Sequence, residues 1–464
     1  MTTYDAWPSL RELADSVRAK ERTANELLDV ALSRIEGGNE PLNAFVHLDE
    51  GLARAAADAV DAAVARGDDP GPLAGVPMGD KDLHLLAGMP TSHGSLWFKG
   101  GDPEPEDGVE NARLRAAGGV FVGKTAAPEF GIVSFASTKA WGITRNPWDL
   151  ERTPGGSSSG SAAAVAAGIV PVATASDGGG SIRIPAAFCG LVGHKSSFGR
   201  VPLPVAMSSQ TSVHGVVATR VEDAARCLDV QAGPDDRDRT SLPPAGVRYE
   251  DAIEQLDVRG LRARWSLDLG FVEHVDPEVA ELTHAAAVEL AAAAGLELDE
   301  EPVLLGDATR VWLSSGVLSS WTMDGLDTRW PDRKGELMGF TRSGMESSFE
   351  ATAPKIGRMH RRRLEFERTV AGVFDEVDVL LTPSTAVPAF AAAGPPPGGA
   401  MATPFTMLAN LCWNPATSVP CGRTADGLPV GLQINARRHR DDVSLRLARI
   451  AEQTRPWPKV VAEA

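Results

Sequence analysis

Three short segments carry the residues whose types and spacing could perform chemistry. The first, TPGGSSSGSAAAVAAG (residues 153–168), places three serines between glycines and ahead of an alanine-rich run. The second, SDGGGSIRIPAAFCG (residues 176–190), places Ser181 directly after three glycines. The third, GVPMGDKDL (residues 75–83), ends an apolar stretch at Lys81. A serine hydroxyl attacks a carbonyl only when a base takes its proton, so the identity of that base decides the chemistry.

The first segment fits three familiar loop types imperfectly. A flexible linker needs polar, structureless flanks, but this run leads into an apolar helix-like stretch. A phosphate-binding loop needs a lysine after its last glycine, and Ser161 stands there instead. The pattern Gly156–Gly160 also matches a nucleophile elbow around Ser158, which needs a preceding strand and a catalytic histidine. The preceding residues are polar, and His360 and His439 lie in charged runs, so Ser158 is the minor alternative.

The second segment predicts a cradle for a developing negative charge. Successive glycines (Gly178, Gly179 and Gly180) leave backbone N–H groups free to converge at the start of a helix, which suits an oxyanion. Ser181 lies in that cradle. No histidine suits the role of base, but a lysine that burial keeps neutral can fill it. Lys81, at the end of an apolar strand-like segment, is the candidate.

The elements that must position these segments alternate between helices and strands. Helices are predicted over residues 23–37, where Thr23 and Glu26 form a capping box, and over residues 51–67 and 109–119. Short buried strands are predicted within residues 72–83, 120–125, 169–177 and 377–388. This alternation favours an α/β fold in which helices cover both faces of a sheet.

Composition and charge exclude several classes of protein. The chain of 464 residues has a net charge of −17, so its mean field repels nucleic acids. The best local basic run, HRRRLEF (residues 360–366), is interpreted as solvated surface. The four cysteines show no metal-like spacing, and no apolar run reaches the about 18 residues of a membrane span. We therefore expect a cytoplasmic protein with reduced cysteines, without metal, nucleic-acid or membrane partners.

The segment from about residue 230 to 375 is richer in charge than the rest and also holds a series of aromatic residues. Trp312, Trp321, Trp330 and Phe340 follow one another at intervals that fit no single helix face. They can serve as core packing or as the wall of a substrate pocket, because both use the same residue types. The sequence leaves these two interpretations open.

Taken together, these segments resemble the amidase signature family. The resemblance rests on GDKD, GGSSSGSAAAVAAG and SDGGGSIRIPAAFCGLVG, with further agreement at GKTAAPEF, LLTPSTAVPAF and NPATSVPCG. It implies a large mixed sheet of about 10 to 11 strands between layers of helices. It further implies a single domain over residues 1–464, with a signature core at 70–205 and a variable substrate-pocket region at 230–375.

The resemblance also implies roles for individual residues. Ser181 corresponds to the nucleophile, Ser157 to a bridging serine after a cis Gly156–Ser157 bond, and Lys81 to the base. The remaining assignments follow from the same motifs. The oxyanion hole comprises Gly178, Gly179, Gly180 and Ser181; supporting positions are Asp177, Arg183 and Ser158; candidate pocket residues are Trp312, Trp321 and Trp413. Two departures from the family pattern are Gly178, where a larger residue is usual, and Trp413, where a small turn is usual.

The implied function is hydrolysis of the C–N bond of a small amide with a bulky apolar or aryl group, without a cofactor. Esters and carbamates are further candidate substrates. The alternative is the glutamine-hydrolysing subunit of a tRNA-dependent amidotransferase, which releases ammonia from glutamine. That subunit often carries glutamine after the arginine of this motif, and Ile184 stands there in this chain. We expect a monomer or homodimer that acts on a small molecule.

Overall fold

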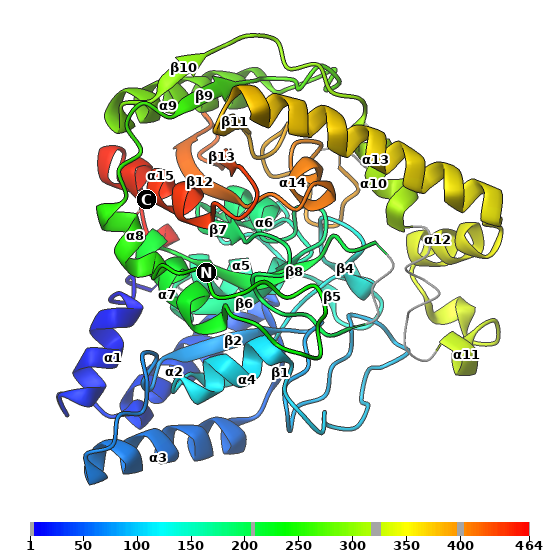
Figure 1. Cartoon of the computed structure of the whole chain (residues 1–464). Coiled ribbons are helices and arrows are strands. Elements are labelled where there is room, and N and C mark those ends of the chain that lie inside the picture. The colour runs from blue at the N-terminus through cyan, green and yellow to red at the C-terminus, as the bar shows by residue number, and fades with distance from the viewer. Residues whose placement is uncertain (1–3, 206–208, 317–325, 397–402, 464) are drawn as a thin grey trace.

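A single eleven-stranded mixed sheet forms the centre of the molecule (Figure 1). The computed structural model describes residues 4–205, 209–316, 326–396 and 403–463, so Trp321 lies outside the described residues. In spatial order the strands are β1 (Phe45–Leu48), β3 (Val120–Thr125), β2 (Pro77–Lys81), β6 (Val172–Asp177), β8 (Val213–Ala218), β7 (Val192–Lys195), β12 (Ala416–Arg423), β13 (Pro429–Ala436), β11 (Val379–Pro383), β9 (Arg262–Trp265) and β10 (Glu297–Asp299). A separate two-stranded sheet pairs β4 (Ser137–Thr138) with β5 (Gly142–Ile143). The expected α/β architecture with a mixed sheet of this size is confirmed.

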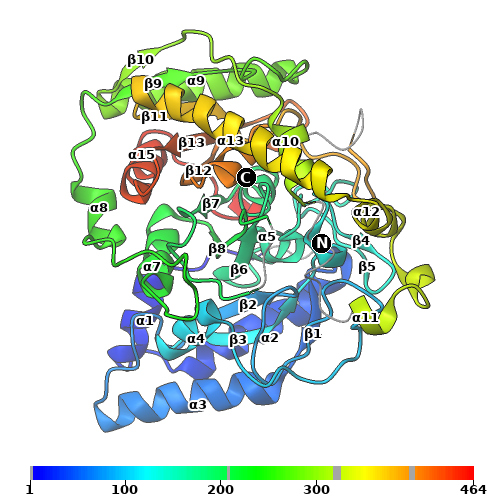
Figure 2. The ribbon, with the colours of Figure 1, turned by 45° about the vertical axis from the view of Figure 1, so that its right-hand side comes forward.

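Helices surround the sheet in the two views of Figures 1 and 2. They are α1 (Leu10–Arg18), α2 (Ala24–Leu42), α3 (Glu50–Arg66), α4 (Val109–Ala116), α5 (Ser159–Ala166), α6 (Arg183–Cys189), α7 (Val221–Gln231), α8 (Tyr249–Gln255), α9 (Pro277–Ala294), α10 (Ala308–Ser315), α11 (Leu326–Arg329), α12 (Gly339–Phe349), α13 (Ala353–Glu376), α14 (Met407–Leu411) and α15 (Asp441–Thr454). One packed group against the sheet contains α2, α5 and α6, and another contains α7, α9 and α15. No helix within the described residues is long and apolar enough to cross a bilayer.

The strand directions explain why two distant motifs meet. Strand β2 is parallel to β6, with Met78 opposite Val172 and Gly79 opposite Ala173. Parallel neighbours end at the same edge of a sheet, so β2 delivers Lys81 beside the end of β6, where Asp177 precedes the glycine-rich loop. The short predicted strands around both motifs are therefore confirmed, and their carboxyl ends define one edge of the sheet.

Helix α2 begins as expected and ends later than expected. The capping box of Thr23 and Glu26 is present, but the helix continues past Gly37 to Leu42 and stops at Asn43, whose φ is 50°. The glycine has a packing role instead: a Cβ on Gly37 would lie 2.5 Å from the Tyr4 hydroxyl oxygen. The predicted end at Gly37 is wrong: Gly37 lies inside the helix, and the left-handed residue that ends it is Asn43.

Helix α5 is the buried support under the first serine-rich segment, and all eight of its residues are buried. Its backbone lies so close to its neighbours that a Cβ on Gly160 would lie 2.2 Å from the Ala44 carbonyl oxygen and 2.3 Å from the Ala126 nitrogen. The Gly160 N–H also donates to the Ala126 carbonyl at 2.8 Å. This contact fixes the segment against the strand end at residue 125.

A Gly160→Ala substitution should therefore destabilise the protein. Overpacking a buried site costs about 1–3 kcal/mol, whereas alanine gains at most about 1 kcal/mol over glycine from helix propensity. We expect a lower thermal midpoint in differential scanning calorimetry. Gly372→Ala, in helix α13 where nothing lies within 4 Å of the added Cβ, is the matched control and should leave the midpoint unchanged or raise it. Equal midpoints for both variants would contradict the close contact at Gly160.

Candidate active site

Lys81 and Ser157 form a buried hydrogen-bonded pair at the carboxyl edge of the sheet. The Lys81 Nζ donates to the Ser157 Oγ at 2.9 Å and to the Ser176 Oγ at 3.0 Å. Lys81 has no exposed surface, and Ser157 is 3% exposed. The backbone of Lys81 is held as well, because its N–H donates to the Thr174 hydroxyl at 2.9 Å. The pair is thus fixed by strands β2 and β6 from two sides.

Burial changes the protonation of this lysine. Removal of the amine from water disfavours the charged form and lowers the pKa of Lys81 to about 7, against an opposing contribution from Asp177. A lysine with this pKa is partly neutral at physiological pH. A neutral amine has a free electron pair, so Lys81 can accept a proton from the Ser157 hydroxyl that it contacts.

The turn that presents Ser157 depends on the glycine before it. The Gly156–Ser157 peptide bond is cis, as expected. A Cβ on Gly156 would lie 2.8 Å from the Phe135 nitrogen and 2.8 Å from the Ser134 carbonyl carbon. Any side chain at position 156 would therefore collide with the backbone of a neighbouring loop, and only glycine allows the turn to pack here.

The second glycine-rich segment forms a loop between β6 and α6, anchored by Asp177. One carboxylate oxygen of Asp177 accepts from the Gly180 N–H at 2.7 Å, and the other accepts from the Ile182 N–H at 3.2 Å. The Gly180 N–H is therefore occupied, which corrects the expectation that every N–H from Gly178 to Ser181 faces a substrate. Within the described residues the N–H groups of Gly178, Gly179 and Ser181 have no hydrogen-bond partner.

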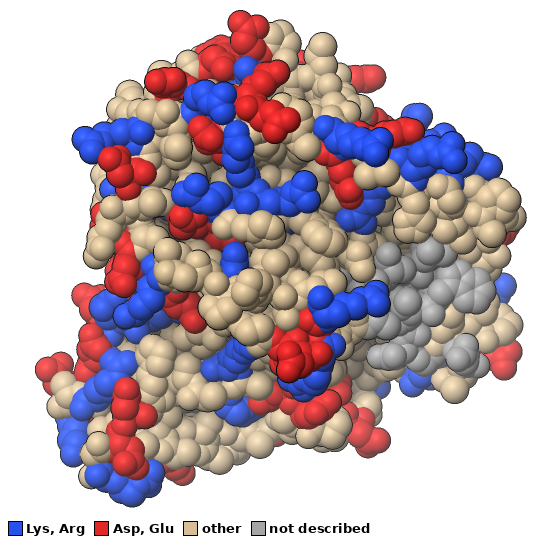
Figure 3. Space-filling model, viewed as in Figure 1, with Lys and Arg blue, Asp and Glu red and all other residues tan. Residues whose placement is uncertain are grey.

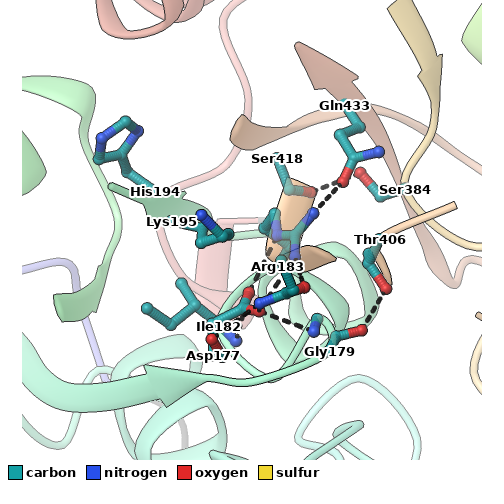
Figure 4. Close-up of polar contacts among 12 residues, drawn as sticks. Asp177, Gly179, Ile182, Arg183, His194, Lys195, Ser384, Thr406, Ser418 and Gln433 are labelled. Atoms are coloured by element: carbon teal, nitrogen blue, oxygen red, sulfur yellow. Dashed lines mark hydrogen bonds and ion pairs between the residues drawn. The ribbon is translucent and has the colours of Figure 1, made fainter. Parts of the chain in front are cut away.

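Arg183 links this loop to strand β13 and helix α14 (Figure 4). Its guanidinium contacts Asp177 at 2.9 Å, the Gln433 Oε1 at 2.7 Å and the Asn410 Oδ1 at 2.7 Å. Burial raises the pKa of Asp177, but Arg183 and the Asn410 amide outweigh it and lower the pKa to about 2. Asp177 is therefore a permanent anion that anchors the loop, as the supporting role assigned to Asp177 and Arg183 anticipated.

The nucleophile candidate itself is partly exposed. Ser181 is of intermediate burial in a neighbourhood that is otherwise almost entirely buried. Its hydroxyl makes no hydrogen bond within the described residues. In contrast, Ser158 is completely buried and directs its hydroxyl to the Ser176 carbonyl at 3.4 Å. Of the two serines, only Ser181 is partly exposed, and only its hydroxyl lacks a hydrogen-bond partner within the described residues.

Of the predicted pocket residues, Trp312 lies at the site and Trp413 does not. The Trp312 Nε1 donates to the Gly178 carbonyl at 2.6 Å, which places this indole against the glycine-rich loop. Trp413 is turned to other partners: its ring stacks on Phe198 with centroids 4.5 Å apart, and its Nε1 donates to the Gln210 carbonyl at 2.8 Å. The structure thus brings Trp312 to the site, and it gives Trp413 a packing role.

Four residues of the site were missed in the sequence. Ser176 contacts Lys81 directly, and its place before Asp177 in the motif was the available signal. Thr406 donates to the Gly179 carbonyl at 2.6 Å, Asn410 to the Asp177 carbonyl at 2.9 Å, and Gln433 accepts from Arg183. These last three come from segments more than 220 residues away in the chain, where nothing in the sequence indicates the contact.

A second polar cluster lies beside the site and resembles a metal centre in composition. His84, Glu110 and His214 bring possible ligand atoms within 4.8 Å of one another. The two imidazole rings, however, are stacked with centroids 4.1 Å apart and an interplanar angle of 22°. A metal ion binds in the plane of each imidazole at about 2.0–2.1 Å from its nitrogen, and one ion cannot lie in two stacked planes. The arrangement fits a direct contact between the His214 Nδ1 and a Glu110 carboxylate oxygen, 2.7 Å apart, better than a metal site.

Known proteins share this chain's sequence and fold over nearly its whole length. A sequence model of the amidase family matches residues 26–445. An acylamidase of Rhodococcus erythropolis is 37% identical over 97% of this chain and 96% of its own. A glutamyl-tRNA(Gln) amidotransferase subunit from a Cyanothece species is 36% identical over 97% of this chain and 98% of its own. The crystal structure of a bacterial aryl acylamidase superposes with a TM-score of 0.90 at 28% identity and covers 97% of both chains.

The chain therefore belongs to the amidase signature family. It is a hydrolase of that family, and three of the motifs that suggested the resemblance hold the Lys81–Ser157 pair and the loop after β6 that carries Ser181.

Proposed function

We propose that this protein is a free-standing amidase that cleaves C–N bonds through an acyl-enzyme on Ser181. The observation that carries the proposal is the 2.9 Å hydrogen bond from a fully buried lysine to Ser157, beneath a loop that presents Ser181. A lysine whose pKa is about 7 can act as a base at neutral pH. No cofactor is required for this chemistry.

In the proposed reaction the proton moves along three residues. Neutral Lys81 takes the proton of Ser157, which takes that of Ser181, while the Ser181 oxygen bonds to the amide carbon and the carbonyl π pair moves to oxygen. As the tetrahedral intermediate collapses, the C–N bond breaks, and the proton returns through Ser157 to the leaving nitrogen. Water then attacks the ester by the same route and releases the acid and free Ser181. The Ser157 and Ser181 hydroxyls meet in the substrate complex, where catalytic hydrogen bonds tighten.

The unoccupied N–H groups of Gly178, Gly179 and Ser181 would stabilise the oxyanion. Donors already fixed in direction cost no reorganisation when charge develops, and each such donor contributes about 10²- to 10³-fold in rate. The Gly180 N–H supports the loop instead, through Asp177.

For the substrate we favour a small amide with an aryl or bulky apolar group, with esters and carbamates as further candidates. Aromatic side chains lie near both glycine-rich loops. Trp312 donates to the Gly178 carbonyl of the second loop. Phe135 lies beside Gly156 of the first, and its ring centroid is 6.3 Å from that of Phe340. One relative is named an acylamidase, and one similar structure is that of an aryl acylamidase, whose name specifies an aryl group. The second candidate is glutamine hydrolysis within an amidotransferase, favoured by the comparable 36% identity to the amidotransferase relative.

We further propose that the protein works in the cytoplasm as a monomer or homodimer, on a small molecule and without nucleic acid. On the face shown in Figure 3, acidic and basic residues are interspersed, with basic residues along the region of α13. Part of the basic run at residues 360–366 is structural: Arg363 donates to the Leu411 carbonyl at 3.0 Å and pairs with Glu367 at 2.8 Å.

A substrate panel separates the two functions. The purified chain alone should hydrolyse p-nitroacetanilide or a bulkier p-nitroanilide faster than glutamine, with p-nitrophenyl carbamates and primary amides as further probes. The Ser181→Ala variant serves as the blank for each probe. Glutaminase activity that arises only with added partner subunits, in the absence of anilide hydrolysis, would establish the amidotransferase function instead.

A further inference from the structure

We propose that Trp312 is a positioning residue that aims the oxyanion donors of the glycine-rich loop. This inference rests on the proposed function, because it assigns the loop a role in holding the oxyanion. Trp312 belongs to α10, in the variable region of the chain, 134 residues away from its partner Gly178. It is therefore a contribution to the site from outside the signature motifs.

The argument begins with the geometry of the peptide unit. A trans peptide is planar, so its C=O and the following N–H point in opposite directions. Whatever holds the carbonyl of one residue therefore aims the N–H of the next. In the loop the three consecutive carbonyls are each held: that of Gly178 by Trp312 at 2.6 Å, that of Gly179 by Thr406 at 2.6 Å, and that of Gly180 by the Ile184 N–H at 2.7 Å.

The three peptide units differ in what their N–H groups do. In the unit between Gly179 and Gly180 both ends are used, because the Gly180 N–H donates to Asp177. In the units that begin at Gly178 and Gly180, the N–H groups of Gly179 and Ser181 have no partner within the described residues. These two N–H groups are aimed away from Trp312 and from Ile184 respectively. The Trp312 indole thus sets the direction of the Gly179 N–H.

Steric fit adds to the hydrogen bond. A Cβ on Gly179 would lie 2.7 Å from two carbon atoms of the Trp312 ring. The indole therefore rests directly on the glycine backbone and blocks the peptide from turning towards it.

The residue that supports the loop is itself packed against other side chains. Val311 and Trp312 pack against an apolar cluster formed by α10, α13 and α14. Phe405 and Leu408 belong to the same cluster, and Thr406, the second clamp of the loop, lies between them in the chain. Trp312 and Thr406, which bind the Gly178 and Gly179 carbonyls, are therefore both supported by the same apolar cluster. Through this cluster the variable region positions the oxyanion donors.

The test removes the indole N–H while keeping an aromatic ring. We expect Trp312→Phe to lower kcat for a p-nitroanilide on the order of 10- to 100-fold, somewhat less than deletion of an oxyanion donor. KM should change less than about threefold, because the ground-state carbonyl does not depend on these donors. Affinity for a phenylboronic acid, which forms a tetrahedral adduct on serine, should fall in parallel with kcat. A purely structural role would not produce this split.

Trp148→Phe is the matched control. The Trp148 Nε1 also donates to a backbone carbonyl, that of Cys189 at 2.8 Å, and the side chain is likewise half-buried. We expect this variant to keep kcat and boronate affinity within about twofold. If Trp312→Phe folds poorly, replacement of Trp312 by 3-benzothienylalanine, in which sulfur stands for the N–H, tests the same bond with an almost isosteric ring.

The outcomes separate the inference from the proposed function. Unchanged kcat and boronate affinity in a folded Trp312 variant, with Ser181→Ala inactive, would overturn the role of Trp312 and leave the amidase assignment intact. Full activity of Ser181→Ala would overturn the assignment itself. A fall in kcat/KM caused by KM alone would assign Trp312 to substrate binding and would also overturn the positioning role.

Discussion

Replacement of Ser181 by alanine is expected to abolish turnover of every substrate that the wild-type protein hydrolyses. Removal of the attacking oxygen leaves only the oxyanion donors and substrate binding, and loss of a serine nucleophile lowers kcat on the order of 10⁶-fold in a well-studied protease. We expect a loss of at least about 10⁴-fold here, measured with a p-nitroanilide under saturating conditions. The thermal midpoint should stay close to wild type, because Ser181 is partly exposed and its hydroxyl bonds nothing in the described residues.

A covalent trap makes the assignment direct. With a p-nitrophenyl ester the wild type should show a burst of nitrophenol, and intact-protein mass spectrometry after acid quench should show one acyl group on the peptide that contains Ser181. Ser158→Ala is the informative control, because Ser158 is the serine of the elbow pattern and lies fully buried against the Ser176 carbonyl. Wild-type rates in Ser181→Ala together with loss in Ser158→Ala would restore the elbow interpretation.

The parts of the site that the sequence predicted lie within short motifs. Ser181 directly follows three glycines, so local spacing indicated it, whereas Ser157, Asp177 and Arg183 were assigned through the family resemblance of the same short motifs. Chemistry indicated Lys81 as a base, since a serine without a suitable histidine needs another one, whereas the place of Ser157 between Lys81 and Ser181 was implied by the family resemblance. The parallel alignment of β2 with β6 then brings the two motifs together.

The parts that the sequence did not predict depend on contacts between distant segments. Thr406, Asn410 and Gln433 hold the glycine-rich loop from the other half of the chain, and no local pattern reports such a contact. Trp312 was anticipated as a possible pocket residue, but its bond to the Gly178 carbonyl required the packing of α10. The continuation of α2 past Gly37 was not predicted either, because a glycine can stand inside a helix as well as after its end.

Substitution of Lys81 tests whether this lysine is the catalytic base. Lys81→Met removes the electron pair that accepts the Ser157 proton, and Lys81→Arg replaces it by a group that stays protonated. We expect both variants to lose kcat on the order of 10³-fold or more, given that general bases contribute about 10²- to 10⁴-fold. In the wild type, log kcat/KM should rise with pH at unit slope and level off above the pKa of Lys81, which is about 7. A flat profile down to pH 5 would contradict a lysine base.

A second lysine must be excluded as the origin of that profile. Burial also lowers the pKa of Lys195 to about 7, but its Nζ bonds the Ser196 and Asn414 carbonyls and not the serines of the site. A Lys195→Met variant should therefore keep the acidic limb. Loss of that limb would identify Lys195 as the group that titrates.

The Lys81→Met substitution is expected to change activity and stability in opposite directions, so that loss of catalysis can be distinguished from unfolding. The folded pKa of Lys81, about 7, lies below its ordinary value of 10.5, so the unfolded chain binds this proton more tightly. Stability contributed through this group therefore rises with pH between these two values, and the burial of a neutral amine is costly at pH 7. Lys81→Met avoids that cost. It should melt at or above the wild-type temperature at pH 7 despite its lost activity, with the difference narrowing as the pH approaches 10. A difference in melting temperature between Lys81→Met and the wild type that stays constant from pH 7 to pH 10 would contradict a lowered pKa of Lys81 in the folded protein.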